Sequence, residues 1–393
     1  MGKNQFLLLL DKNSMFIKIL LFISLFFCFP LWAEVGSTNL ELNKEKLSMP
    51  NNSNINIRDY YSGKGGKGGD MLYIADIITN LNDAFSFNVS VPNDSSLYGT
   101  LSGKEIPYIG FILYPTTETN KRPDYKEPLG TILPHMQKVG EPPIFKNDKK
   151  DYPLIIYSHG SGDHPLWLLS TLSGLAENGY IVAALFHGDK RFKSMMSDLN
   201  ALQTIALRPL SIKTAIDVLQ NNSPFSNHIN FNQIGTLGLS LGASTTMAIM
   251  GGKINGPNKS TQRTAIDSRI IASANLNPWL GNNGFSLFGE NYSGINGVVN
   301  PYLALVGTKD RAAPFQVTRD IISKLGGPKY MIGFTDEGHG FSDEAMMISR
   351  TWIQIFFDAY VKNDETQFKR ITTMKSVKGD IENFIEIPYQ QDN

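Results

Sequence analysis

The sequence predicts an α/β fold, with a mostly parallel, doubly wound sheet and helices on both of its faces. From about Ile106 onward, short apolar runs alternate with segments of helical pattern. Several of the apolar runs are continuous, as expected for strands that are buried on both faces of a parallel sheet. Alternation of strands and helices is typical of parallel sheets whose strands are joined by right-handed crossovers.

Each element of this fold can be assigned to a segment. The predicted strands are Tyr108–Tyr114, Leu154–Tyr157, Tyr180–Phe186, Ile234–Leu239, Ile270–Ala274, Tyr302–Val306 and Tyr330–Phe334. The predicted helices are Leu166–Ala176, Ala201–Gln220, Ala243–Met250, Phe315–Leu325 and Glu344–Asn363. Two further segments, Gly251–Thr264 and Gly281–Asn300, are rich in Gly, Asn and Ser, and we expect them to form loop insertions over a site.

Ser240 is the predicted nucleophile. It stands at the centre of Gly238-Leu239-Ser240-Leu241-Gly242, between the predicted strand Ile234–Leu239 and the predicted helix Ala243–Met250. A nucleophilic serine on a sharp strand-to-helix turn needs neighbours without a Cβ, so that the chain can turn tightly and a substrate can approach. The five-residue motif is weak evidence by itself, and its place between a buried strand and a helix gives it weight.

A serine hydroxyl becomes a good nucleophile when a histidine accepts its proton and an acid orients that histidine. Where the serine occupies such a strand-to-helix turn, the chain order is serine, acid, histidine. Of the six histidines, only His339 follows Ser240. Asp310 lies just past the C-terminal end of an apolar strand, the edge at which parallel sheets bind ligands. Asp336 and Glu337 are alternative acids, although their closeness to His339 in sequence would demand a tight local fold.

Two backbone amides are predicted to stabilise the negative charge that develops on a carbonyl oxygen. One is the amide of Leu241, at the start of the helix after the serine. The other is the amide of Ser161, in the turn Ser158-His159-Gly160-Ser161-Gly162 that follows a strand. Because His159 precedes Ser240 in the chain, we interpret it as a structural residue of this turn. His187 ends another strand, and both a substrate contact and a loop-stabilising role are open for it.

The substrate pocket is predicted near the loop insertions. Trp279, Phe285 and Phe288 follow a strand or lie within an insertion, so we expect them at the rim of an acyl pocket. The other three histidines show no metal-ligand spacing, and the sequence contains no His-Glu-x-x-His helix. We therefore predict chemistry that requires no metal.

Taken in chain order, these segments resemble the branch of α/β hydrolases that contains the platelet-activating factor acetylhydrolases and bacterial predicted dienelactone hydrolases. The resemblance runs from about Tyr108 to Phe357. It rests on Gly110–Pro115, Ser158-His159-Gly160, Gly179–Asp189, Arg208-Pro209 through Leu219, the Ser240 turn, Asp267–Pro278, Val306–Asp310 with Pro314, and Gly338-His339-Gly340-Phe341.

The resemblance implies an α/β-hydrolase fold with Ser240, Asp310 and His339 as a triad. It also implies an oxyanion hole from the amides of Leu241 and Ser161, and hydrolysis of short-acyl esters without a cofactor. Leu239 and Leu241 depart from the histidine and the aromatic residue that usually flank the family's nucleophile, and Ala243 replaces a frequent glycine. True dienelactone hydrolases use a cysteine nucleophile, so Ser240 argues against that activity.

The N-terminal residues 1–33 predict a signal peptide. The segment from Ile19 to Ala33 is almost wholly apolar, follows two lysines and ends in a small residue. It is shorter than the roughly 20 residues of a membrane-spanning helix. Met15 is an alternative start, and an uncleaved anchor is an alternative interpretation. We expect a periplasmic or secreted protein.

The domain organisation follows from these patterns. We expect a polar N-terminal extension over residues 34–105, loosely ordered at 35–60 and leading into the first strands, and then a catalytic domain over 106–393. The run Gly63–Gly69 lacks the Ser or Thr of a phosphate-binding loop, so we interpret it as flexible. The single cysteine, Cys28, lies within the predicted signal peptide, so the mature protein would carry no thiol.

The overall prediction is an exported carboxylic ester hydrolase acting on short-acyl or lipid esters. Lys and Arg together equal Asp and Glu, at 36 each, so nucleic acid is not expected as a partner. The expected partner is a small-molecule ester or a lipid, with peripheral membrane contact left open; the oligomeric state is not predicted. A serine peptidase or acyltransferase is the alternative, since one triad serves all acyl transfer. A catalytically inactive binding protein is the third interpretation.

Overall fold

A computed structural model describes residues 35–38, 85–126, 132–137, 141–146, 151–189, 201–255, 261–262, 265–282, 285–374 and 383–387. The predicted signal peptide (residues 1–33), the alternative start Met15, Cys28 and the run Gly63–Gly69 lie outside these residues. Export and the flexible glycine run therefore stay predictions. Among the helices of the described part, none is both long and apolar enough to cross a membrane.

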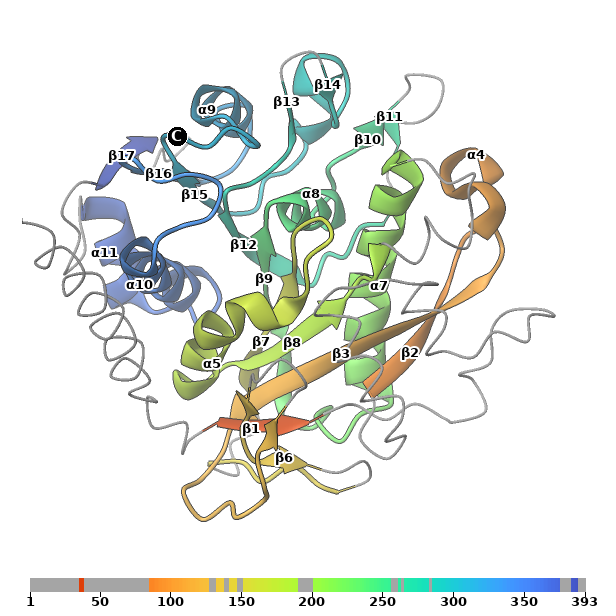
Figure 1. The fold of residues 1–393 in the computed structure, drawn as a ribbon, viewed down its shortest axis with the longest axis vertical. Helices are drawn as coiled ribbons and strands as arrows, with labels where there is room; N and C mark the ends of the chain where they lie inside the picture. Colours follow the sequence, from red (N-terminus) through yellow and green to blue (C-terminus); the bar gives the residue numbers. More distant parts are fainter. Residues whose placement is uncertain are drawn as a thin grey trace, which may run out of the picture.

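Parallel strands form the centre of one large mixed sheet (Figure 1). In spatial order these strands are β8, β7, β9, β12, β15 and β16, each parallel to its neighbour. Their bounds are β7 Tyr152–Ser158, β8 Ile181–Phe186, β9 Ile229–Leu239, β12 Ile270–Leu276, β15 Tyr302–Gly307 and β16 Lys329–Phe334. Nearly all of their side chains are buried, which confirms the predicted mostly parallel sheet.

Antiparallel strands extend the sheet at both edges. At one edge, β3 pairs with β8, and both β1 and β2 pair with β3; at the other edge, β17 pairs with β16. The short β6 runs parallel to β1. The bounds are β1 Val35–Thr38, β2 Phe85–Ser90, β3 Glu105–Pro115, β6 Met136–Gln137 and β17 Asn383–Ile387.

Two of these strands lie within the segment assigned to the N-terminal extension. Residues 35–38 were expected to be loosely ordered, yet they form β1, in which Val35 is fully buried and pairs with Pro115 of β3. β2 pairs with β3 along its whole length. The large sheet therefore takes in residues before 106. A four-residue strand in a polar context has too few apolar positions to give a periodic signal.

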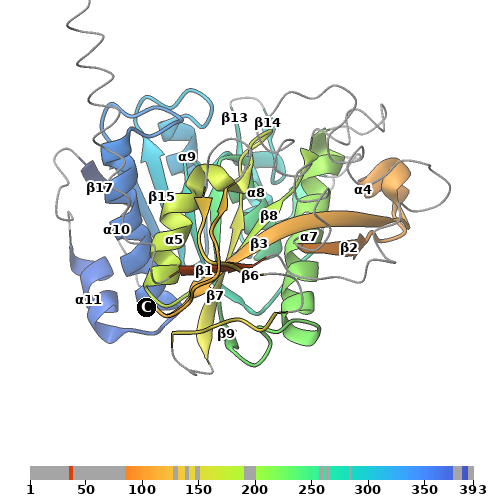
Figure 2. The same cartoon turned by 60° about the horizontal axis from the view of Figure 1, so that its bottom comes forward.

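The helices cover both faces of the sheet (Figure 2). α5 and α10 pack together on one face, and α7 packs on α8 on the other. The bounds are α5 Leu169–Glu177, α7 Ala201–Asn221, α8 Leu241–Ile249, α9 Phe315–Ile322, α10 Asp343–Tyr360 and α11 Glu365–Thr373. All five predicted helices are present, with ends that differ by a few residues.

Short strands and short helices lie in the connections between these elements. Two hairpins, β10–β11 and β13–β14, form within the loop insertions that were expected over the site. The bounds are β4 Tyr125–Lys126, β5 Ile132–Leu133, β10 Ile254–Asn255, β11 Thr261–Gln262, β13 Gly281–Asn282, β14 Phe285–Ser286, α4 Ser95–Tyr98, η3 Gly99–Leu101, η4 Pro165–Leu168 and η5 Glu290–Ile295.

Local sequence determines where helix α10 begins, directly after the loop that carries His339. Ser342 precedes it, and its hydroxyl accepts a hydrogen bond from the amide of Ala345 at 3.2 Å. Asp343 and Glu344 occupy the first turn, where negative charge is favoured by the helix dipole. Trp352 is buried with the other apolar residues of one face against β12 and β15. The loop between β16 and α10, which carries His339, is thus anchored at both ends.

The first turn of α8 packs directly on the end of β7. A Cβ placed on Gly242 would overlap the backbone carbonyl of Ser158, and that backbone belongs to the central sheet and cannot easily move. The glycine after the predicted nucleophile is therefore required by the packing between a helix and a strand. This contact also sets how far the α8 N-terminus stands from the turn after β7.

We predict that Gly242→Ala destabilises the protein, by roughly 1–3 kcal/mol, because the added methyl group overpacks a rigid backbone contact. Gly174 in α5 is the matched control, since a Cβ there would meet nothing within 4 Å. Gly174→Ala should be neutral or stabilising by up to roughly 1 kcal/mol, as expected inside a helix. Urea unfolding measures both. Equal stability of the two variants would contradict the packing argument.

Candidate active site

Ser240, His339 and Asp310 form a continuous hydrogen-bonded chain. His339 Nε2 lies 2.9 Å from Ser240 Oγ, and His339 Nδ1 lies 2.7 Å from Asp310 Oδ2. The Asp310 side chain is fully buried, whereas 36% of the His339 side chain is exposed. With the imidazole proton on Nδ1 and directed to Asp310, Nε2 can accept the serine proton. The exposed edge of the imidazole leaves the serine open to a substrate.

Ser240 adopts an uncommon backbone conformation, with φ 52° and ψ −116°. For a residue with a Cβ, such a conformation costs on the order of 1–3 kcal/mol and persists only where the surroundings enforce it. Here the Ser240 amide donates to the carbonyl of Leu276 at 2.9 Å, and the Ser240 carbonyl accepts from the amide of Trp279 at 3.1 Å. Both bonds tie the turn to the end of β12. The strained turn holds the Ser240 side chain above the sheet edge.

Backbone hydrogen bonds also fix the orientation of the Asp310 carboxylate. Asp310 Oδ1 accepts hydrogen bonds from the amides of Ala312 and Ala313, each at 2.8 Å, which leaves Oδ2 for His339. The two alternative acids have other partners. Asp336 pairs with Lys309 at 2.8 Å on the exposed surface. Glu337 accepts from the amide and hydroxyl of Ser342, at 2.8 and 2.5 Å, at the start of α10.

Asn277 is a site residue that sequence reasoning did not single out. Its side-chain Nδ2 donates to the carbonyl of His339 at 2.7 Å, and its Oδ1 accepts from the amide of Gly307 at 2.9 Å. It is buried, and its φ of 42° turns the chain out of β12. The side chain thus bridges the end of β15 and the His339 loop. No motif marks a lone asparagine, so only the fold reveals this contact.

The two predicted oxyanion amides belong to the start of α8 and to the turn after β7. Leu241 begins α8, where the first amides lack acceptors within the helix. Gly160, which precedes Ser161, approaches the nucleophile closely: a Cβ on it would lie 3.5 Å from Ser240 Cβ. Ser161 itself is exposed. The turn that carries Ser161 thus lies beside the nucleophile, and the catalytic role of both amides stays a prediction.

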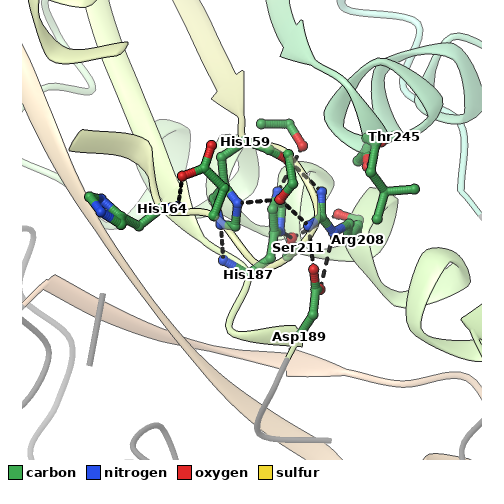
Figure 3. A network of polar contacts seen from close by, with 11 residues as sticks. His159, His164, His187, Asp189, Arg208, Ser211 and Thr245 are labelled. Carbon is green, nitrogen blue, oxygen red and sulfur yellow. Dashed lines mark hydrogen bonds and ion pairs between the residues drawn. The ribbon is translucent and has the colours of Figure 1, made fainter. Parts of the chain in front are cut away.

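His187 belongs to a buried network behind the turn after β7 (Figure 3). Its Nε2 lies 2.8 Å from Ser158 Oγ, and its backbone amide donates to His159 Nε2 at 3.0 Å. His187 and Ser158 are both fully buried, so neither can be reached by a substrate in this structure. The predicted substrate contact of His187 is corrected by this burial. The geometry supports the alternative role, stabilisation of the loop.

His159 is held neutral in this network. Its Nδ1 donates to the carbonyl of Gly160 at 2.8 Å while its Nε2 accepts from the His187 amide, so both ring nitrogens are engaged in one tautomer. Burial, followed by the nearby positive charge of Arg208, lowers the pKa of His159 from 6.5 to about 3. His159 thus has the structural role that was predicted from its position before the serine.

Of the three aromatic residues predicted at the pocket rim, the structure places Phe288 in the core, and a rim position of Trp279 stays a prediction. Trp279 is half-buried beside the nucleophile, joined to it through its backbone. Phe288 is fully buried in the hydrophobic core, so its prediction as a rim residue is wrong. A run rich in Gly and Asn gives no signal of which aromatic side chain turns inward. The side chain of Phe285 lies outside the described part.

The described residues contain no group of three or more His, Cys, Asp or Glu side chains placed to hold a metal ion.

A comparison with protein families found a match over one segment of the chain. A family described as "Platelet-activating factor acetylhydrolase, isoform II" matches residues 135–195. The matched segment contains β7, the turn with Gly160 and Ser161, α5, β8 and His187, and it ends before the triad residues. The chain is an α/β hydrolase similar to the platelet-activating factor acetylhydrolases. No curated protein matches the chain. The family consists of serine carboxylic ester hydrolases, and this hydrolase is an enzyme of that class.

Replacement of the acid by its amide tests the orientation of His339 in this hydrolase. In Asp310→Asn, the amide oxygen can still accept from Ala312 and Ala313, but the NH₂ group then faces His339 Nδ1 and favours the wrong tautomer. We expect kcat to fall by about 10⁴-fold with an unchanged fold. Asp336→Asn is the matched control and should stay within about twofold of the wild type. A larger loss in the Asp336 variant would identify that residue as the acid.

The depressed pKa of His159 predicts a pH dependence of stability. Below pH 6.5 the unfolded chain binds a proton that the folded state refuses, so stability is full above pH 6.5 and is lost as the pH falls toward 3. One such group contributes a slope of up to about 1.4 kcal/mol per pH unit. Urea unfolding between about pH 6 and pH 4 should give a shallower slope for His159→Gln than for the wild type. Parallel slopes would contradict a neutral buried His159.

Proposed function

We propose that this hydrolase is an exported carboxylic ester hydrolase that acts on short-acyl or lipid esters through an acyl-enzyme on Ser240. The observation that carries the proposal is the unbroken chain from Ser240 Oγ through His339 to the buried Asp310. Such a chain supplies a nucleophile, a general base and an orienting acid. Export is supported by the apolar N-terminal segment from Ile19 to Ala33.

The proposed reaction has two halves. Ser240 Oγ attacks the ester carbonyl while His339 Nε2 accepts its proton, and the amides of Leu241 and Ser161 stabilise the oxyanion. The protonated His339 then donates to the departing alcohol, which leaves an acyl group on Ser240. Water then attacks the acyl carbonyl while His339 accepts its proton. The second oxyanion collapses as His339 returns this proton to Ser240 Oγ, which releases the acid and restores the serine. Asp310 stays ionised and stabilises the imidazolium in both halves.

A serine peptidase or an acyltransferase would use the same three residues. An acyltransferase differs in which nucleophile resolves the acyl-enzyme, and a peptidase differs in which leaving group the site accepts. The ester class is favoured here by the family match across residues 135–195. A comparison of p-nitrophenyl butyrate with the corresponding anilide separates ester from amide cleavage.

The proposal predicts that Ser240→Ala abolishes ester hydrolysis. With p-nitrophenyl butyrate, kcat should fall by at least about 10³-fold, and labelling by a fluorophosphonate probe should disappear. Ser158→Ala is the control, because Ser158 forms the buried contact with His187 that also joins a serine to a histidine. It should keep its labelling and stay within about tenfold of the wild-type rate. Full activity of Ser240→Ala would reject the proposal.

A further inference from the structure

We propose that Arg208 is a positioning residue of the oxyanion hole, which fixes the orientation of the peptide bond between Gly160 and Ser161. The inference deepens the proposed function and rests on it, because it concerns the amide assigned to the oxyanion. Arg208 lies in α7, far from the three triad residues in sequence, and only 1% of it is exposed. It touches neither the nucleophile nor the base in any contact described above.

Arg208 binds the turn after β7 through two backbone carbonyls. Its Nη1 donates to the carbonyl of His159 at 2.6 Å, and its Nη2 donates to the carbonyl of Gly160 at 3.0 Å (Figure 3). On its other side, Nε donates to Asp189 Oδ1 at 3.1 Å, and Nη2 pairs with Asp189 Oδ2. The guanidinium therefore joins the first half of α7, the segment after β8 and the oxyanion turn.

The geometry of the peptide bond links the Arg208 contact to the direction of the Ser161 amide. The described residues contain no cis peptide bond, so the carbonyl of Gly160 and the amide of Ser161 lie in one plane and point in opposite directions. That carbonyl accepts from two sources, Arg208 Nη2 and His159 Nδ1 at 2.8 Å. Both donors lie on the buried side of the turn. The Ser161 amide therefore points away from these two donors, in a turn whose Gly160 lies beside the nucleophile: a Cβ on Gly160 would lie 3.5 Å from Ser240 Cβ.

The choice of arginine fits this task. A guanidinium offers five donors in a rigid planar fork, so one side chain can bind two carbonyls and a carboxylate at once. A lysine carries a compact charge that cannot reproduce this fork. A buried ion pair contributes little to stability beyond a well-packed apolar pair of similar size. Packing alone does not explain why an ion pair between Arg208 and Asp189 is buried here, whereas a role in orienting the turn does.

The test separates orientation from folding with two variants. Arg208→Lys keeps the charge beside Asp189 but loses the fork. The double variant Arg208→Met with Asp189→Leu replaces the ion pair by apolar side chains and leaves no unpaired charge. Arg269→Met is the matched control, since Arg269 pairs with Asp217 and Asp267 beside the opposite end of β12. Thermal unfolding, kcat and KM for p-nitrophenyl butyrate are measured for all of them.

A second measurement reports on the oxyanion hole itself. A butyl trifluoromethyl ketone adds to the serine as a tetrahedral oxyanion, whereas butan-1-ol has neither a carbonyl nor an anionic oxygen to place in the oxyanion hole. We expect both Arg208 variants to lose roughly 10–100-fold in kcat and a similar factor in affinity for the ketone. Inhibition by butan-1-ol and KM should change less than about threefold. Arg269→Met should match the wild type in every kinetic value.

Other outcomes overturn the proposal. A folded Arg208→Lys or a folded double variant with wild-type kcat and ketone affinity would show that the guanidinium does not orient the amide. Equal losses in affinity for the ketone and for butan-1-ol would mean that Arg208 only maintains the fold. Fluorophosphonate labelling of the wild type is followed in parallel, because a missing label at Ser240 would reject the proposed function itself rather than the role of Arg208.

Discussion

The contact between the first turn of α8 and the end of β7 governs the geometry of the site. Gly242 rests against the carbonyl of Ser158, so the helix can start only where the strand backbone permits. The chain from β9 must then reverse at Ser240, which takes a positive φ. The same close approach brings the turn after β7 beside the nucleophile. One steric constraint thus places both the serine and the loop that carries Ser161.

The parallel sheet brings in the remaining groups. β9, β12, β15 and β16 are neighbours with a common direction, so the segments that follow them meet at one edge. Ser240 and His339 are 99 positions apart in the chain and still approach to 2.9 Å. Buried polar side chains then adjust the loops by binding backbone carbonyls: Asn277 holds the His339 loop, and Arg208 holds the oxyanion turn. Each acts on a loop without occupying the reaction space.

Sequence patterns were sufficient for the framework and for the triad residues. Continuous apolar runs mark strands such as β7 and β15 because their side chains are buried on both faces. Ser240, Asp310 and His339 could be found because their chemistry needs definite residue types in a fixed chain order. The structure joins these three by hydrogen bonds, and their catalytic roles stay predictions until they are tested.

Other features depend on tertiary packing that no local pattern records. Asn277 and Arg208 bind carbonyls far away in sequence, and an asparagine or arginine in a strand end or helix has no motif. His187 follows a strand in the way a site residue would, and only its burial shows that it faces inward. Phe288 is drawn into the core for the same reason. The short β1 is stabilised by pairing with β3 rather than by its own composition.

The central claim is that an acyl group passes through Ser240, and rapid-quench mass spectrometry tests it most directly. The wild-type protein is mixed with excess p-nitrophenyl butyrate, quenched in acid within the first turnover and digested for peptide mapping. A butyryl group is expected on the peptide that contains Ser240. A butyryl group on another residue, or hydrolysis of the ester by Ser240→Ala at the wild-type rate, would contradict passage through Ser240.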